Sequence, residues 1–175
     1  MPLTISELDT TDPRAVNRFI DLPFRLYRDN AQWVPPIVDD TRLMLNRRKN
    51  PYYAHSDAVF FTAERDGRQV GQVAVLENRH YNAHWGSQTA NFYLFDCEDD
   101  LEAARGLFGA IEAWAKSRGL TKVVGSKGFL QGDGLGIPAA TECPSLPILG
   151  HPPLFSASKG IKRASIKALL AACPV

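Results

Sequence analysis

Residues 58–76 read AVFFTAERDGRQVGQVAVL, and this stretch decides the fold. Two runs rich in β-branched and aromatic residues flank Asp66-Gly67, a dipeptide typical of tight hairpin turns. The second run also alternates apolar and polar residues, as a half-covered strand does. The stretch therefore predicts an antiparallel hairpin with strands over 58–64 and 69–76.

A strand, a long helix and another strand are predicted to follow the hairpin. Residues 89–95 read TANFYLF, and residues 120–124 read LTKVV. Between them an apolar stripe at helical spacing runs to about Arg118, and Gly119 suits a left-handed C-terminal cap. Asp99 and Glu102 have the spacing of a capping box at the helix start. This order is a βαβ unit, in which the two strands run parallel.

The N-terminal third is expected to place one edge strand and two helices before the hairpin. Residues 1–10 alternate enough to form the strand, and Asp12-Pro13 is typical of a helix start. Pro23 is expected to end or kink that helix, and a second helix is predicted over 37–46. The basic residues that follow are interpreted as dipole partners of this helix or as a site for an anionic ligand: Arg47, Arg48 and Lys49.

The composition of the 175 residues is that of a globular protein with a core: 45% are apolar and the net charge is +1. A charge so near zero argues against a general grip on nucleic acid or on an anionic membrane, so neither is expected as a partner. The sequence contains no apolar run of the roughly 20 residues that cross a bilayer. The N-terminus lacks a signal-peptide pattern, and Cys97, Cys143 and Cys173 lack metal-ligand spacing. We therefore expect free thiols, no metal site and a cytoplasmic location.

A glycine-rich loop, GSKGFLQGDGLG, occupies residues 125–136, just beyond the last predicted strand. Ligands often bind at the carboxyl end of parallel strands, so Lys127 and Gly128 are candidate ligand-binding residues, with Asp133 as a base or a turn residue. The loop lacks the ending of a Walker motif and does not open a helix. A plain cluster of turn residues is the alternative interpretation.

The order helix, helix, hairpin, strand, helix, strand resembles the GNAT superfamily of acetyl-CoA-dependent N-acetyltransferases. The resemblance is closest to a group of uncharacterised bacterial GNAT-like proteins and covers about residues 19–136. It is carried by FIDLPFRLYRDNAQWVPP, NPYYAHSD, FTAERDGRQVGQVAVLENRHYN, FYLFDCEDD and the glycine-rich loop. It implies an α/β fold, with a mixed sheet flanked by helices.

The resemblance also implies a cofactor and a site. The donor would be acetyl-CoA or another acyl-CoA, and the acceptor a small-molecule or peptide amine. A backbone amide of the third strand would polarise the thioester, which makes Phe92 and Leu94 candidates beside Lys127 and Gly128. Candidate bases are Glu64 and Glu77 at the ends of the hairpin strands and two histidines of the polar loop expected over 77–87: His80 and His84. An ordinary exposed polar side chain is the alternative interpretation at each of these four positions.

One segment departs from the pattern of the superfamily. GNAT proteins hold the coenzyme A pyrophosphate where the strand passes into the long helix, on a glycine-containing turn. Here residues 96–106 contain no glycine before Gly106, and five carboxylates lie between Asp96 and Glu102. Like charges would repel a pyrophosphate, whereas the same carboxylates suit a helix N-terminus. We predict that they stabilise the helix.

The C-terminal part departs as well. We expect an incomplete GNAT-like domain over residues 1–137, its C-terminal strands missing, and a proline-rich tail over 138–175 with a basic helix near its end. A divergent tail, a truncation and a change of reading frame stay open as interpretations. Two functions follow: an N-acyltransferase, active or inactive, or a non-catalytic ligand- or protein-binding module that keeps the fold. An exposed sheet edge would also allow a homodimer.

Overall fold

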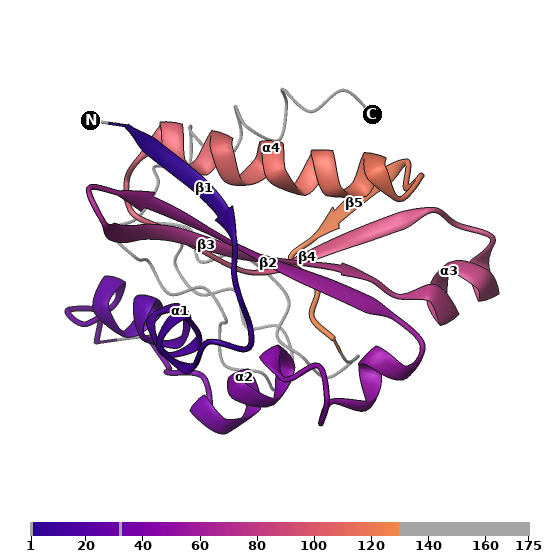
Figure 1. Ribbon diagram of the computed structural model, residues 1–175, viewed down its shortest axis with the longest axis horizontal. Helices are drawn as coiled ribbons and strands as arrows, with labels where there is room; N and C mark the ends of the chain where they lie inside the picture. Colours follow the sequence, from indigo (N-terminus) through magenta and orange to yellow (C-terminus); the bar gives the residue numbers. More distant parts are fainter. Residues whose placement is uncertain (1, 32, 130–175) are drawn as a thin grey trace, which may run out of the picture.

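The computed structural model of the protein describes residues 2–31 and 33–129 (Figure 1). The predictions for the tail over 138–175, for the loop beyond Phe129 and for Cys143 and Cys173 lie outside the described residues. Within them the fold is the expected one: a mixed sheet with helices on both faces (Figure 1).

The sheet has five strands in the order β1-β2-β3-β4-β5. The first three pairings are antiparallel and the last, between β4 and β5, is parallel, which confirms the hairpin and the βαβ unit. The strands are β1 (Leu3–Glu7), β2 (Asp57–Arg65), β3 (Arg68–Glu77), β4 (Thr89–Cys97) and β5 (Lys122–Gly125). β1 is an edge strand as predicted, and all four residues of β5 are exposed. Pairing with a second copy at such an edge stays a prediction.

The hairpin turn is the predicted one. Asp66 and Gly67 both have positive φ values, 55° and 73°, as a two-residue turn between twisted strands requires. Across the hairpin Thr62 pairs with Gln72, and a bulge follows next to Ala63. The turn therefore fixes the register of the two central strands.

Helix α4 (Leu101–Ser117) covers one face of the sheet (Figure 1). Its apolar stripe packs on β2, β3 and β4, with Leu107 and Ile111 fully buried. The helix ends as predicted, because Gly119 has a φ of 69° and its N–H donates to the carbonyl of Lys116 at 3.0 Å. It begins one residue later than predicted: Asp100, and not Asp99, is the N-cap and accepts from the N–H of Ala103 at 3.1 Å.

The opposite face is covered by α1 (Pro13–Leu26), α2 (Val38–Leu45) and a short 3-10 helix, η1 (Pro51–Ala54) (Figure 1). A second core forms there around Phe19 and Phe60, whose rings meet edge to face at 5.7 Å. α1 starts as predicted, with Asp12 accepting from the N–H of Arg14 at 2.9 Å. Pro23 is buried and does not end the helix, since its carbonyl still accepts from the N–H of Tyr27 at 2.9 Å.

A short helix, α3 (Arg79–Trp85), replaces the loop expected between β3 and β4. Asn78 caps it by accepting from the N–H of Tyr81 at 2.9 Å, and Gly86 ends it in the left-handed conformation. No residue of this helix is buried, so no apolar stripe packs it on the core. Local capping is the only signal of α3, which explains why periodicity missed it.

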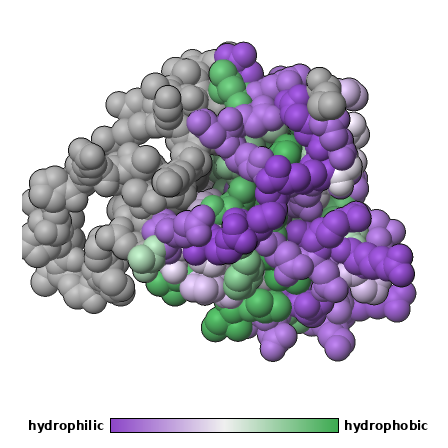
Figure 2. Space-filling view, turned by 90° about the vertical axis from the view of Figure 1, so that its left-hand side faces the viewer, coloured by the Kyte–Doolittle hydropathy of each residue, from purple (hydrophilic) through white to green (hydrophobic). Residues whose placement is uncertain are grey.

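The surface seen in Figure 2 is mostly hydrophilic, with apolar side chains gathered towards its lower part. The exposed large apolar residues include a group in and just before α2: Val34, Ile37, Val38 and Leu43. Within the described residues, no helix has both the length and the apolar character that a membrane span requires.

Candidate functional site

The parallel strands β4 and β5 pair over a short length and then separate. Their last pair is Phe92 opposite Gly125, where β5 ends, whereas β4 continues to Cys97. The N–H of Lys127 donates to the carbonyl of Phe92 at 2.9 Å. This bond holds the chain that follows β5 against β4 at the point of separation.

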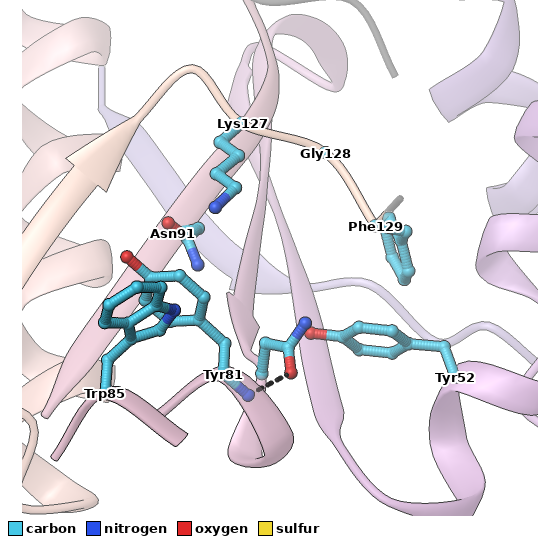
Figure 3. A pocket seen from close by; sticks show the side chains of 8 residues that line it. Tyr52, Tyr81, Trp85, Asn91, Lys127, Gly128 and Phe129 are labelled. Carbon is cyan, nitrogen blue, oxygen red and sulfur yellow. Dashed lines mark hydrogen bonds between the residues drawn. The ribbon is translucent and has the colours of Figure 1, made fainter. Parts of the chain in front are cut away.

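A pocket of about 350 Å³ lies beside this point (Figure 3). Residues from four separate parts of the chain line it: Tyr52 of η1; Asn78, Tyr81 and Trp85 of the α3 segment; Asn91 of β4; and Lys127, Gly128 and Phe129. We call it the polar pocket, because its central groups are an amide and an ammonium. Its volume is within the range of small-molecule sites.

Asn91 brings the amide. It precedes Phe92 on β4, is only 5% exposed, and points into the polar pocket (Figure 3). Within the described residues its side chain forms no hydrogen bond. No fully buried polar side-chain atom of the described residues lacks a partner, so the unbonded amide of Asn91 reaches the open surface of the pocket, where a ligand can meet it.

Lys127 brings the positive charge. Its Nζ atom lies 4.4 Å from the centre of the Tyr81 ring, and its side chain is directed towards Asn91 and Tyr81 (Figure 3). It forms no ion pair with a described carboxylate, and the described lining of the pocket contains no acidic residue. The electrostatics of the pocket therefore favour an anion or a carbonyl oxygen over a cation.

A second pocket of about 610 Å³ adjoins the first. The two share Tyr52, Asn78 and Phe129 as walls, and the rings of Tyr52 and Phe129 lie 4.9 Å apart. Its other lining residues come from α2, η1 and α3: Asp40, Leu43, Met44, Asn50, Pro51, His55 and His80. We call it the apolar pocket. Burial raises the pKa of Tyr52 far above its ordinary value, so the shared phenol stays neutral and can donate a hydrogen bond.

Two stacked histidines stand at the apolar pocket. The rings of His55 and His80 lie 4.0 Å apart and nearly parallel, at 13°. The Nδ1 atom of His55 is 2.6 Å from the hydroxyl of Ser56, which accepts from the N–H of Arg79 at 3.1 Å. Ser56 thus links the His55 ring to the start of α3.

The structure brings three predicted site residues to these pockets and leaves the others outside. Lys127 and Gly128 line the polar pocket, and His80 lines the apolar pocket. Glu64 lies on β2 near the hairpin turn, opposite Thr4, and lines neither pocket. Glu77 accepts a hydrogen bond from Arg118 at 3.2 Å, and it too lies outside both.

Phe92 and Leu94, the candidates on β4, lie where the strand leaves its partner. The side chain of Phe92 packs into the α4-side core, 5.5 Å from the ring of Phe108, so only its backbone faces the split. Leu94 has a positive φ of 51° and packs on the other core. It lies where the β3–β4 register shifts, because two residues of β4, Leu94 and Phe95, stand opposite Val73 alone. The roles of the predicted site residues stay predictions.

The N-terminus of α4 is occupied by its own carboxylates, as predicted. Asp100 caps the helix and accepts two hydrogen bonds from Arg65, at 3.1 and 2.8 Å. Burial raises the pKa of Asp100, but the bonds from Ala103 and Arg65 outweigh it and hold that pKa below its ordinary value. Arg65 also pairs with Glu102 at 2.8 Å. These contacts leave the helix end capped by carboxylate, where the usual GNAT turn offers glycine and free amides.

Sequence reasoning missed Asn91, Tyr81 and Tyr52. A polar residue inside the otherwise apolar strand TANFYLF was a signal for Asn91, because a strand between two others buries both faces. Nothing in the sequence marks the two tyrosines, since they join the site only through α3 and η1. The described residues contain no cluster of three potential metal ligands.

No protein-family model matches the chain. The chain is 27% identical over 166 residues to the bacterial ceramide synthase of Caulobacter vibrioides (strain NA1000 / CB15N), which covers 94% of this chain and 43% of that protein. It is 34% identical over 107 residues to protein YghO of Escherichia coli (strain K12), covering 61% and 27%. The chain thus spans less than half the length of each of these curated relatives.

Two solved structures are similar to the described fold. A tandem GNAT protein from the clavulanic acid biosynthesis pathway matches with a TM-score of 0.53 and 19% identity, over 67% of this chain and 34% of that one. An aminoglycoside acetyltransferase from an uncultured soil metagenomic sample, in complex with sisomicin, matches with a TM-score of 0.50 and 16% identity, over 70% and 75%. Sheet order, helix placement and these likenesses agree, and the chain has the fold of the GNAT acetyltransferases.

Proposed function

We propose that this chain is a domain of an acyl-CoA-dependent N-acyltransferase. The observation that carries the proposal is the separation of β4 and β5 after Phe92, directly beside the polar pocket. A thioester that enters along β4 at this split would bring its carbonyl close to Asn91 and Lys127. These two groups are the ones suited to hold a carbonyl oxygen as it gains negative charge.

The reaction needs little else from side chains. The nitrogen of an amine attacks the thioester carbon, a C–N bond forms, the C–S bond breaks, and the sulfur leaves as the thiol of coenzyme A. A base has to remove one proton from the nitrogen, directly or through water. Of the predicted bases, His80 lines the adjoining pocket and stacks on His55, whereas Glu64 and Glu77 line neither pocket, and the assignment of the base stays a prediction.

The comparisons support this class of reaction. The fold is shared with acetyltransferases, and one curated relative is a bacterial ceramide synthase. A ceramide is an N-acyl amide, so both kinds of relative point to acyl transfer onto nitrogen.

The fit of coenzyme A is uneven along its length. The acyl end suits the split, but the pyrophosphate does not suit the N-terminus of α4, where Asp100 already caps the helix and the exposed Asp99 adds negative charge. Glu98 is paired with Arg25 and Arg68 and adds little. We infer that the phosphates are held away from this turn, if the chain binds the whole cofactor alone.

The same capped helix end favours a second candidate function. A domain that lacks the pyrophosphate-binding site but has both pockets would serve as a non-catalytic ligand-binding module. The two functions differ in the affinity for coenzyme A. The N-acyltransferase would bind coenzyme A, whereas the ligand-binding module would bind only a ligand that fills the two pockets.

The test is titration of the chain with acetyl-CoA, decanoyl-CoA and free coenzyme A, read by calorimetry and by thermal unfolding. Binding of an acyl-CoA should raise the unfolding temperature as mass action requires. If millimolar acyl-CoA gives neither a heat of binding nor a rise in unfolding temperature, the proposal that this chain is an enzyme is wrong.

A variant that removes one negative charge before α4 tests where the phosphates of coenzyme A bind. Asp99 is exposed and has no ion pair with a described residue. If the phosphates pass this turn, Asp99→Asn should tighten binding severalfold by removing a like charge. If they lie elsewhere, as we infer, the affinity should not change.

A further inference from the structure

The polar pocket and the apolar pocket, taken together, match one kind of ligand. The polar pocket offers hydrogen-bond donors at one end, from the amide of Asn91 and the ammonium of Lys127. The apolar pocket shares Phe129 with it and adds Leu43 and Met44 to an apolar part of the wall, while polar side chains line the rest: Asp40, Asn50, His55, Asn78 and His80. A ligand that fills both has an oxygen-bearing head and an apolar tail.

The charge of the head follows from the lining. Lys127 has no ion pair with a described carboxylate, and an ammonium on the ligand would meet it in a pocket whose described lining has no acid. The carboxylate that lines the apolar pocket, Asp40, sits on the exposed part of α2. The head is therefore a carbonyl or carboxylate oxygen, which Lys127 and Asn91 can both donate to.

The length of the tail follows from the space. An acetyl group would occupy only the polar pocket and would leave the apolar pocket of about 610 Å³ unused. Leu43 is also 43% exposed, although it is apolar and lies at this pocket. A tail that covers Leu43 and Met44 would remove that surface from water, and each methylene buried there would tighten binding.

We propose that the two pockets form an acyl-chain site: the carbonyl or carboxylate oxygen is bound by Lys127 and Asn91, and a chain of about eight or more carbons lies against Leu43, Met44 and Phe129. The inference rests on the proposed function and deepens it. The acyl group handled by this chain is a medium or long one, and acetyl is a poor substitute.

The experiment is calorimetric titration of the whole chain with sodium acetate, hexanoate, octanoate and decanoate, below the concentration at which each forms micelles. Decanoate should bind and acetate should not, with the affinity rising about fourfold for each added methylene while the apolar pocket fills. Decyltrimethylammonium has the same tail and the opposite charge, and it should bind at least tenfold more weakly. Equal binding of the two would show detergent-like adsorption and overturn the site.

Matched variants test each end of the site. Lys127→Met should weaken decanoate at least fivefold, whereas Lys122→Met, on the exposed start of β5, should leave it unchanged. Leu43→Ser should weaken the binding of decanoate more than that of hexanoate, because it removes apolar surface that only the longer chain contacts. All three positions carry side chains outside the buried cores, so thermal unfolding should confirm that each variant folds. An unchanged affinity in Lys127→Met overturns the proposal.

The outcomes separate this inference from the proposed function. If acetyl-CoA and decanoyl-CoA bind equally well, the transferase proposal stands and the acyl-chain site is wrong. If decanoate binds and responds to Lys127→Met while no acyl-CoA binds, the site stands and the transferase proposal fails for this chain.

Discussion

The ring of Phe92 lies directly against Gly125, where β4 and β5 form their last pair: a Cβ atom on Gly125 would fall 2.3 Å from Cε1 of that ring. Phe92 is 3% exposed and packed among the aromatic residues of the α4-side core, so its ring has little room to move. The split beside the polar pocket therefore depends on a residue without a side chain.

Gly125→Ala should lower the free energy of unfolding by about 1–3 kcal/mol, because the added methyl overpacks the core. Gly109→Ala is the matched control. Gly109 lies on the exposed side of α4 with nothing within 4 Å of the added atom, so alanine there should stabilise by about 0.4–1 kcal/mol. Denaturant unfolding of both variants measures the difference, and a Gly125→Ala variant as stable as the parent would contradict the packing argument.

Asp100→Ala should destabilise the protein by about 1–2 kcal/mol. It removes the N-cap of α4 and strips Arg65 of one of its carboxylate partners. Glu102→Gln is the control, because Glu102 is largely exposed and its pair with Arg65 should be worth no more than about 0.5 kcal/mol. Chemical unfolding followed by circular dichroism would show both effects. Equal losses in the two variants would mean that the cap itself contributes nothing.

Asp57 should make stability depend on pH in the acid range. Burial raises its pKa, but Arg47 and Arg118 outweigh burial and hold the pKa below the ordinary value of 3.8. Its stabilising contribution is therefore fully present above pH 3.8 and is lost as the pH falls through the lower folded value. Asp57→Asn should cost about 1–3 kcal/mol at pH 7 and almost nothing at the acid end of a pH series.

Asp29→Asn is the control for that series. Asp29 and Arg28 are 3.9 Å apart and both are largely exposed, so removing this pair should change stability by less than about 0.5 kcal/mol at every pH. A pH dependence as large in Asp29→Asn as in Asp57→Asn would assign the acid sensitivity to general charge and not to the contacts of Asp57 with Arg47 and Arg118.

Cys97 should be an unreactive thiol in the folded protein. Burial, with help from nearby carboxylates such as Asp100 and Glu98, raises the pKa of Cys97 to about 12, so the thiolate is scarce at pH 8. In a Cys143→Ser, Cys173→Ser variant, reaction with a disulfide reagent at pH 8 should be at least tenfold slower than after unfolding in urea. Rapid reaction of the folded variant would show that Cys97 is open to solvent.

The sequence was sufficient for the elements whose signals are local. The Asp66-Gly67 turn, the cap at Asp12 and the stripe of α4 each depend on neighbours within a few residues, so their patterns predicted the hairpin and the βαβ unit. The carboxylates before α4 were also interpreted correctly, because helix capping acts within one turn. Of the two effects expected at Pro23, an end or a kink, the end does not occur, because packing on the sheet keeps α1 helical to Leu26.

The site required the tertiary structure. Tyr52, Tyr81, Asn91 and Lys127 are far apart in the chain, and only the order of the five strands brings η1, α3 and the chain after β5 to one pocket. Groups that lie far away in the sequence decide whether Lys127 has an ion-pair partner and whether the amide of Asn91 has a hydrogen-bond partner. The sequence by itself therefore determined that the protein is an α/β domain and that the N-terminus of helix α4 is acidic. The tertiary structure alone decided which of its polar groups remain available to a ligand, because hydrogen bonds and ion pairs form between neighbours in space.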